Sequence, residues 1–182
     1  MTRSPTAAGA RRAPVRLIVR LLDPGWRRRL PAAERLARRA ARAALAGAGR
    51  RGARPGELCL VLADDALLRA LNRTYRGIDK PTNVLSFRGE PRAPRGGARN
   101  YGDVVVARET LVGEARTQGE PPGDHLTHLV VHGVLHLLGY DHEAKTEANR
   151  MERLEVAILA RLGVADPYQT SRGRPAGRRR PR

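Results

Sequence analysis

Cysteine is almost absent from this chain of 182 residues, in which Cys59 is the single example. One cysteine excludes an intrachain disulfide and any metal site built from several thiolates. Cys59 lies in the apolar run LCLVL, where we expect a small buried residue. A metal site in this chain would therefore use histidine or carboxylate ligands.

Aromatic residues and long apolar runs are scarce as well. Aromatics make up 3% of the chain, which argues against a surface on which successive bases stack. The apolar stretch of residues 126–138 is too short, and too interrupted by histidine, to span a bilayer. Near the N-terminus, Arg16 and Arg20 break the segment VRLIVRLL, which spoils it as the core of a secretory signal. We therefore expect a soluble, cytoplasmic protein with no membrane partner.

Positive charge is abundant but unevenly distributed. The net charge is +17, and arginine accounts for all but two of the 35 basic residues. Residues 1–54 contain fifteen arginines against two acidic residues, residues 172–182 contain six arginines and no acid, and the body between them is close to neutral. Basic flanks favour a polyanionic partner such as nucleic acid. A biased coding sequence gives the same arginine-rich composition, so charge alone leaves both interpretations open.

The length fits one domain. We predict a domain at residues 14–167, between a disordered basic arm at 1–13 and a disordered Arg-rich tail at 168–182. Strands are predicted at residues 15–22, 57–62, 82–87 and 104–107, with a mobile loop at 88–100. Helices are predicted at residues 31–45, 67–76, 109–118, 124–138 and 143–162, with Asp64 or Asp65 as the N-cap of the second and Asp124 as the N-cap of the fourth. Because the two kinds of element do not alternate strictly, the pattern favours an α+β fold, a small mixed sheet packed with about five helices.

All five histidines lie in the fourth predicted helix and the turn that follows it. His132 and His136 are four residues apart, so they share one helix face, and Gly139 is placed to end the helix in a left-handed conformation. His142 follows on the emerging turn. Three imidazoles with an open fourth position are the geometry of a catalytic zinc, which can lower the pKa of a bound water toward about 7. We predict that His128 packs beside this site and that His125 is partly exposed at the helix start, neither being a ligand.

The spacing HxxxHxxGxxH also matches that of the metzincin proteases. Those enzymes require a glutamate directly after the first histidine as general base, and this chain has Gly133 there. The predicted metal site is therefore metzincin-like in its ligands, whereas the catalytic base of a protease is missing. The helix that carries the site is apolar on nearly every side, so we expect it at the centre of the domain.

The stretch HGVLHLLGYDH at residues 132–142 resembles the signature of the YbeY family of bacterial endoribonucleases and rRNA maturation factors. Two further stretches agree in order, LNRTYRGIDKPTNVLSF at residues 71–87 and YGDVVV at residues 101–106. Met151 and Glu155 also fall where the last helix of that family would place them. The resemblance covers about residues 15–165 and leaves the basic arms outside.

The resemblance implies a metal-dependent, single-strand-specific endoribonuclease that acts in 16S rRNA 3′-end maturation and in quality control of 70S ribosomes. Its implied partners are single-stranded RNA, rRNA and the small ribosomal subunit. It also implies one Zn²⁺ per chain on His132, His136 and His142, and a functional role for Arg76. A guanidinium facing the metal would suit stabilisation of a pentacoordinate phosphate.

The chain departs from the family pattern at two positions, with Asn83 where Asp is usual and Arg88 where Pro is usual. Asn keeps the shape of Asp but not its charge, so the proton acceptor is left open between Asp103, Asp141 and another group. Two other hypotheses remain: a ribosome-associated assembly or RNA-binding factor whose zinc is mainly structural, and a zinc metalloprotease, which Gly133 disfavours.

Overall fold

The structure is a computed structural model that describes residues 15–51, 54–89, 99–141 and 145–168. The predicted arm at residues 1–13, most of the predicted tail and loop, and His142 lie outside these ranges. Tyr168, which the sequence assigned to the tail, is described and packs against the domain, because its hydroxyl donates a hydrogen bond to Oε2 of Glu155 at 2.6 Å.

Four strands form one mixed sheet in the order β1 (Arg16–Leu21), β2 (Gly56–Ala63), β4 (Arg99–Ala107) and β3 (Val84–Arg88). Strand β2 pairs in parallel with both β1 and β4, and β3 is antiparallel to β4. Burial alternates along β2 from Gly56 to Leu62, so Leu58, Leu60 and Leu62 are buried on the inner face and Cys59 lies on the outer face. Cys59 is therefore half-buried, and the expectation of a buried residue was wrong.

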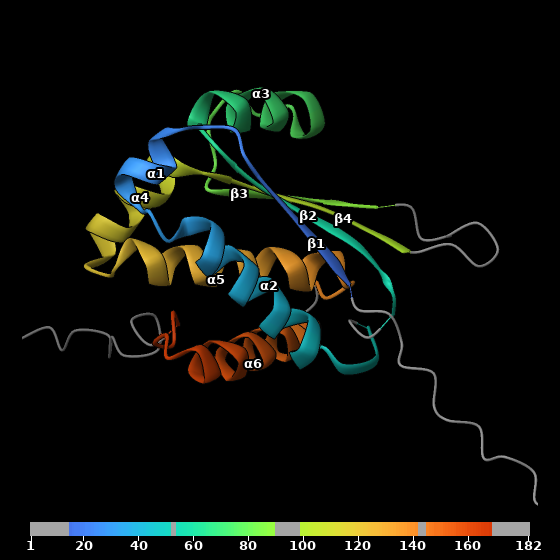
Figure 1. Cartoon of the computed structure of the whole chain (residues 1–182). Helices are drawn as coiled ribbons and strands as arrows, with labels where there is room; N and C mark the ends of the chain where they lie inside the picture. Colours follow the sequence, from blue (N-terminus) through green and yellow to red (C-terminus); the bar gives the residue numbers. More distant parts are fainter. Residues whose placement is uncertain (1–14, 52–53, 90–98, 142–144, 169–182) are drawn as a thin grey trace, which may run out of the picture.

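The helices cover both faces of this sheet (Figure 1). Helices α2 (Ala33–Gly47) and α5 (Pro122–Leu137) pack on the inner face, α3 (Asp65–Arg76) packs on the outer face, and α6 (Lys145–Leu162) packs on α2 and α5 from the far side. Helix α4 (Arg108–Gln118) follows β4 directly, and a short 3₁₀ helix, η1 (Gly49–Arg51), follows α2. The predicted α+β class with a small mixed sheet is confirmed.

A short additional helix, α1 (Gly25–Arg29), lies between the first predicted strand and the first predicted helix, where the sequence predicted no helix. Its Trp26 is fully buried, and the indole Nε1–H donates to the carbonyl oxygen of Ala63 at 2.9 Å. This contact spans two elements far apart in the chain, so no local pattern could have indicated it.

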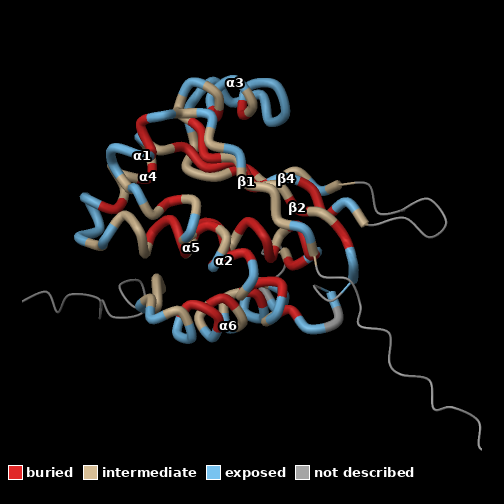
Figure 2. Tube along the Cα trace, viewed as in Figure 1, coloured by how far each residue is buried: buried red, intermediate tan, exposed pale blue. Residues whose placement is uncertain are grey.

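Helix α5 is the most enclosed helix, with buried residues on nearly all sides (Figure 2). It begins at Pro122, two residues earlier than predicted, and Asp124 is not its N-cap. The reason is that proline has no N–H to satisfy and suits the first helical turn. Its end is as predicted, since Gly139 has a φ of +83° and Tyr140 N–H donates to the carbonyl of Leu135. Within the described ranges, no helix is long and apolar enough to cross a membrane.

Gly133 allows α5 to approach the sheet closely. A Cβ atom at this position would lie 2.7 Å from Cγ1 of Val104 on β4 and 2.9 Å from Oγ of Ser86 on β3. The Ser86 hydroxyl also donates to the carbonyl oxygen of Gly133 at 3.2 Å, which ties the middle of the helix to the strand. A glutamate at residue 133 would have no room here, so the general base of a metzincin cannot be accommodated.

The close approach predicts that Gly133→Ala destabilises the protein. The added methyl group meets Val104, a buried and conformationally stiff side chain, so we expect a loss of about 1–3 kcal/mol in the free energy of unfolding, measured by urea denaturation. Gly113→Ala in α4 is the matched control, because nothing lies within 4 Å of its Cβ. The control should gain up to about 1 kcal/mol from helix propensity. Equal stability of Gly133→Ala and wild type would contradict the interpretation.

Candidate active site

Two histidines of α5 converge on one point in space. His132 and His136 lie one helical turn apart, and their Nε2 atoms are 3.1 Å from each other. Two nitrogens that bind one zinc ion at about 2.0–2.1 Å in a tetrahedral arrangement lie about 3.3 Å apart. The pair is therefore close to the spacing that a shared metal ion requires.

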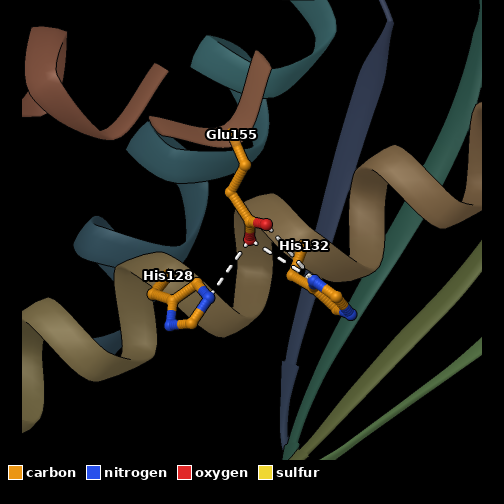
Figure 3. Close-up of side chains that lie close together, drawn as sticks. All are labelled: His128, His132 and Glu155. Carbon is orange, nitrogen blue, oxygen red and sulfur yellow. Dashed lines mark hydrogen bonds and ion pairs between the residues drawn. The ribbon is translucent and has the colours of Figure 1, made fainter. Parts of the chain in front are cut away.

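The opposite side of His132 faces a buried carboxylate from α6. Glu155 has no solvent-exposed surface, and its Oε1 lies 3.4 Å from Nδ1 of His132 and 3.2 Å from Nε2 of His128 (Figure 3). Burial alone would raise the pKa of Glu155, but the hydrogen bonds and charges of His128 and His132 lower this pKa to about 2. For the neighbouring Tyr168, burial and the charge of Glu155 both raise the pKa of the hydroxyl group. Glu155 is thus an ionised acceptor that orients the ring of His132.

Glu155, His128 and His132 could themselves hold a metal ion, since one ligand atom from each lies within 4.8 Å of the others. The ring of His132 accordingly offers two candidate positions, one at Nδ1 with Glu155 and His128 and one at Nε2 with His136. The first is enclosed between α5 and α6, whereas the second opens into a cleft.

That cleft has a volume of about 370 Å³. Its walls come from the C-terminal end of α3, the start of β3, the C-terminal half of α5 and the turn after α5; the residues are Arg76, Thr82, Asn83, Val84, Ser86, His132, His136 and Asp141. The structure therefore brings Arg76, predicted from a separate stretch, to the same cleft as His132 and His136. The third predicted ligand, His142, lies outside the described residues.

The position of Arg76 depends on how α3 ends. Gly77 adopts a left-handed conformation with a φ of +71°, which terminates the helix directly after Arg76. The following loop is held to α3, because Arg69 forms a bidentate pair with Asp79 and the Asn72 side chain donates to the carbonyl oxygen of Lys80. The guanidinium at residue 76 is itself exposed to solvent.

The two candidate proton acceptors lie in two different depressions. Asp141 lines the cleft. Asp103 alternates with Val104 along β4 and lies on the outer face, in a depression shared with Cys59 and Arg20. It also adds to the burial effect that raises the pKa of the Cys59 thiol. Asp103 is therefore excluded from the cleft, and Asp141 is the only acidic residue that lines it in the part of the chain described.

Both departures from the family pattern make contacts at the cleft. Arg88, at the end of β3, donates from Nε to the carbonyl oxygen of His136 at 2.9 Å, so it joins the strand to the C-terminal end of α5. Asn83 donates from Nδ2 to Oε2 of Glu114 at 2.9 Å. Glu114 in turn contacts His125, which is buried with 3% exposure, so the expectation that His125 is partly exposed was wrong. The cause is the packing of α4 against the start of α5.

Comparison with known proteins places the sequence among nucleases. The sequence model of the family described as Endoribonuclease YbeY matches residues 28–163. Endoribonuclease YbeY of Rhodospirillum rubrum is 51% identical over 169 residues, which cover 88% of this chain and 84% of that protein. The protein of the same name from Azorhizobium caulinodans is 50% identical over 146 residues, covering 80% of this chain and 91% of that protein. A solution structure of TM1509 from Thermotoga maritima aligns with a TM-score of 0.48 at 22% identity, covering 91% of this chain and 99% of that chain.

The buried carboxylate predicts that Glu155→Gln weakens metal binding while the protein still folds. Loss of an outer carboxylate partner of a ligating histidine costs about 10–100-fold in metal affinity, and we expect a loss of this size in competition with a zinc chelator. Glu147→Gln, at an exposed position of the same helix, is the matched control and should bind as wild type does.

A second variant separates the two candidate metal positions. If the ion binds at Nε2 of His132 and His136, His128→Ala should retain metal affinity to within about tenfold, because it changes only a neighbour of Glu155. Complete loss of metal binding in His128→Ala would instead assign the ion to the group of His128, His132 and Glu155.

Proposed function

Because this chain belongs to the YbeY endoribonuclease family, we propose that it is a metal-dependent endoribonuclease that cuts single-stranded RNA in the cleft beside α5. The observation that carries the proposal is the convergence of two imidazole Nε2 atoms, 3.1 Å apart, in a cleft that also contains the guanidinium of Arg76. Metal and arginine together are the usual means of stabilising charge on a phosphoryl group.

We infer that the metal is one zinc ion per chain, bound by His132, His136 and His142. Histidine nitrogens are good zinc ligands, and the spacing of the two described ones fits a tetrahedral site. The alternative group around Glu155 is less suited to catalysis, because Glu155 and His128 do not line the cleft that contains Arg76. Zinc at the cleft would supply Lewis acidity and a water of lowered pKa.

The side chains of the cleft account for the rest of the reaction. Arg76 offers up to two parallel N–H donors to the phosphate, and its charge stabilises the negative charge that develops during displacement. The carboxylate of Asp141 is the group in the cleft that can accept a proton from the attacking water. Glu155 fixes the orientation of His132, so that Nε2 faces the cleft.

We further propose that the substrate is rRNA, with the 16S 3′ end on the small ribosomal subunit as the site of action in the cytoplasm and a role in ribosome quality control. The support is the family membership together with a basic surface on α1 and α2. This surface consists of Arg27, Arg28, Arg29, Arg35, Arg39 and Arg42, all exposed. Such a surface suits the phosphate backbone of a long RNA.

Substitution of a zinc ligand and substitution of the arginine should both impair cleavage, but only the first should also remove the zinc. His136→Ala should lose both zinc and cleavage of single-stranded RNA, whereas Arg76→Ala should keep its zinc and lose about 100-fold in kcat. Arg73→Ala, exposed on the same helix, is the matched control for charge and should cleave normally. Zinc content and cleavage are measured on the same samples. Cleavage by His136→Ala at the wild-type rate would indicate a contaminating nuclease and would sink the proposal.

The basic surface should contribute to RNA affinity by neutralising phosphates. The double variant Arg35→Gln, Arg42→Gln should bind a long single-stranded RNA with a shallower dependence of log K on log salt, by about 0.7 for each phosphate that the protein no longer neutralises. The variant Arg35→Lys, Arg42→Lys keeps the charge and should retain the wild-type slope. An unchanged slope in the glutamine variant would contradict a role of these arginines in RNA binding, and compositional bias would then explain why they are present.

A further inference from the structure

A series of polar side chains leads from the cleft toward α4. Asn83 lines the cleft and donates from Nδ2 to Oε2 of Glu114 at 2.9 Å. The same oxygen accepts a hydrogen bond from Nε2 of His125 at 2.8 Å, and Nδ1 of His125 lies 2.6 Å from Oε1 of Glu120. We name these four residues the Asn83 array.

The Asn83 array is separate from the proposed metal site. Its contacts lie on the side of α5 that faces α4, whereas Glu155 approaches α5 from α6. The side chain of His125 is 4% exposed, and the side chains of Glu114 and Glu120 are 35% and 28% exposed. Burying an imidazole is costly unless its nitrogens are paired; here Nε2 is hydrogen-bonded to Glu114, and Nδ1 lies within ion-pair distance of Glu120. The zinc ligands do not require this arrangement, so it needs another explanation.

The array holds residue 83 by both backbone and side chain. The carbonyl oxygen of Asn83 accepts the Ala107 N–H at 2.9 Å, at the junction of β4 and α4. The side chain reaches Glu114 on α4, the helix that starts at this junction. An amide whose NH₂ group is committed to a carboxylate cannot flip without losing that bond, so the position of Oδ1 is determined as well.

We propose that Asn83 contacts the RNA strand in the cleft through Oδ1, and that Glu114 and His125 are positioning residues that hold its amide in one orientation. The proposal rests on the proposed function, since it takes the cleft as the RNA site. An acceptor oxygen of fixed direction suits a ribose 2′-hydroxyl or a base N–H, both of which a single strand exposes.

The array also explains why an amide, in place of the usual Asp, suits this position when residue 114 is a glutamate. A carboxylate at residue 83 would face the carboxylate of Glu114 at hydrogen-bonding distance, and the two like charges would repel. Exchanging the amide and the carboxylate between residues 83 and 114 restores a pair of hydrogen-bond donor and acceptor. With Asn83→Asp and Glu114→Gln together, the new glutamine amide can donate to both the new carboxylate and Nε2 of His125. The side chain at residue 83 would then again present an oxygen in the original direction.

The exchange is tested with zinc-loaded protein and a short single-stranded RNA oligonucleotide. We expect Asn83→Asp to raise KM about tenfold while kcat, zinc content and unfolding midpoint change little, and the double variant Asn83→Asp, Glu114→Gln to return KM to within about threefold of wild type. Thr82→Asp is the matched control, because it adds the same charge to the cleft one residue away. Glu114→Gln should not correct its effect. If Asn83→Asp does not fold, Asn83→Ala takes its place, with the same rise in KM and no correction by Glu114→Gln.

Dissociation constants for the same oligonucleotide, measured on metal-free protein, distinguish this proposal from the proposed function. If wild type binds RNA without cutting it, the nuclease proposal fails. The role of Asn83 can still be decided then, by comparing the dissociation constants of wild type, Asn83→Asp and the double variant. Failure of Glu114→Gln to correct a folded, zinc-loaded Asn83→Asp overturns the positioning role. An Asn83→Asp variant with wild-type KM and affinity overturns the contact with RNA, as does wild-type protein that neither binds nor cuts RNA.

Discussion

Helix α5 lies against the sheet at a distance that only a glycine at residue 133 permits, and the geometry of the cleft follows from this approach. A side chain at residue 133 would overlap Val104 and Ser86, so the helix would have to move outward and carry both histidines with it. Because Ser86 also bonds to the carbonyl oxygen of Gly133, β3 is held beside the helix, and its residues form one wall of the cleft. The same approach removes the space that a protease would use for its general base. One packing constraint therefore positions the two histidines at the cleft and excludes a protease-type general base beside them.

Ionisable groups surround α5 in two clusters, in each of which histidine and carboxylate side chains lie within ion-pair distance of one another. On the α6 side, Glu155 meets two histidines and the hydroxyl of Tyr168; on the α4 side, His125 meets two carboxylates. A charge buried without a partner costs several kcal/mol, whereas a hydrogen-bonded pair can be tolerated. In each cluster a carboxylate holds a side chain that lines the cleft. Glu155 holds the ring of His132, and Glu114 holds the amide of Asn83. This is how a preorganised site is obtained from side chains that would otherwise be mobile.

Local signals in the sequence were sufficient where one element determines its own structure. The i, i+4 spacing of His132 and His136 put both rings on one helix face, Gly139 ended that helix as expected, and Asp64 caps α3 by accepting the Leu67 N–H. Local signals failed where packing between distant segments decides. Trp26 anchors α1 to β2 through a hydrogen bond to the carbonyl oxygen of Ala63, and His125 is buried because α4 packs against the start of α5.

The amino-acid sequence by itself determined the fold class, the family and the face of α5 that carries His132 and His136, because periodicity and a short motif are properties of neighbouring residues. The tertiary structure decided the rest. It brought Arg76 and Asn83 to the histidines from a separate stretch, put Asp103 in a different depression on the outer face of the sheet, and gave His132 its buried partner on α6. Those relations depend on which faces of strands and helices meet across the core, and no spacing along the chain encodes them.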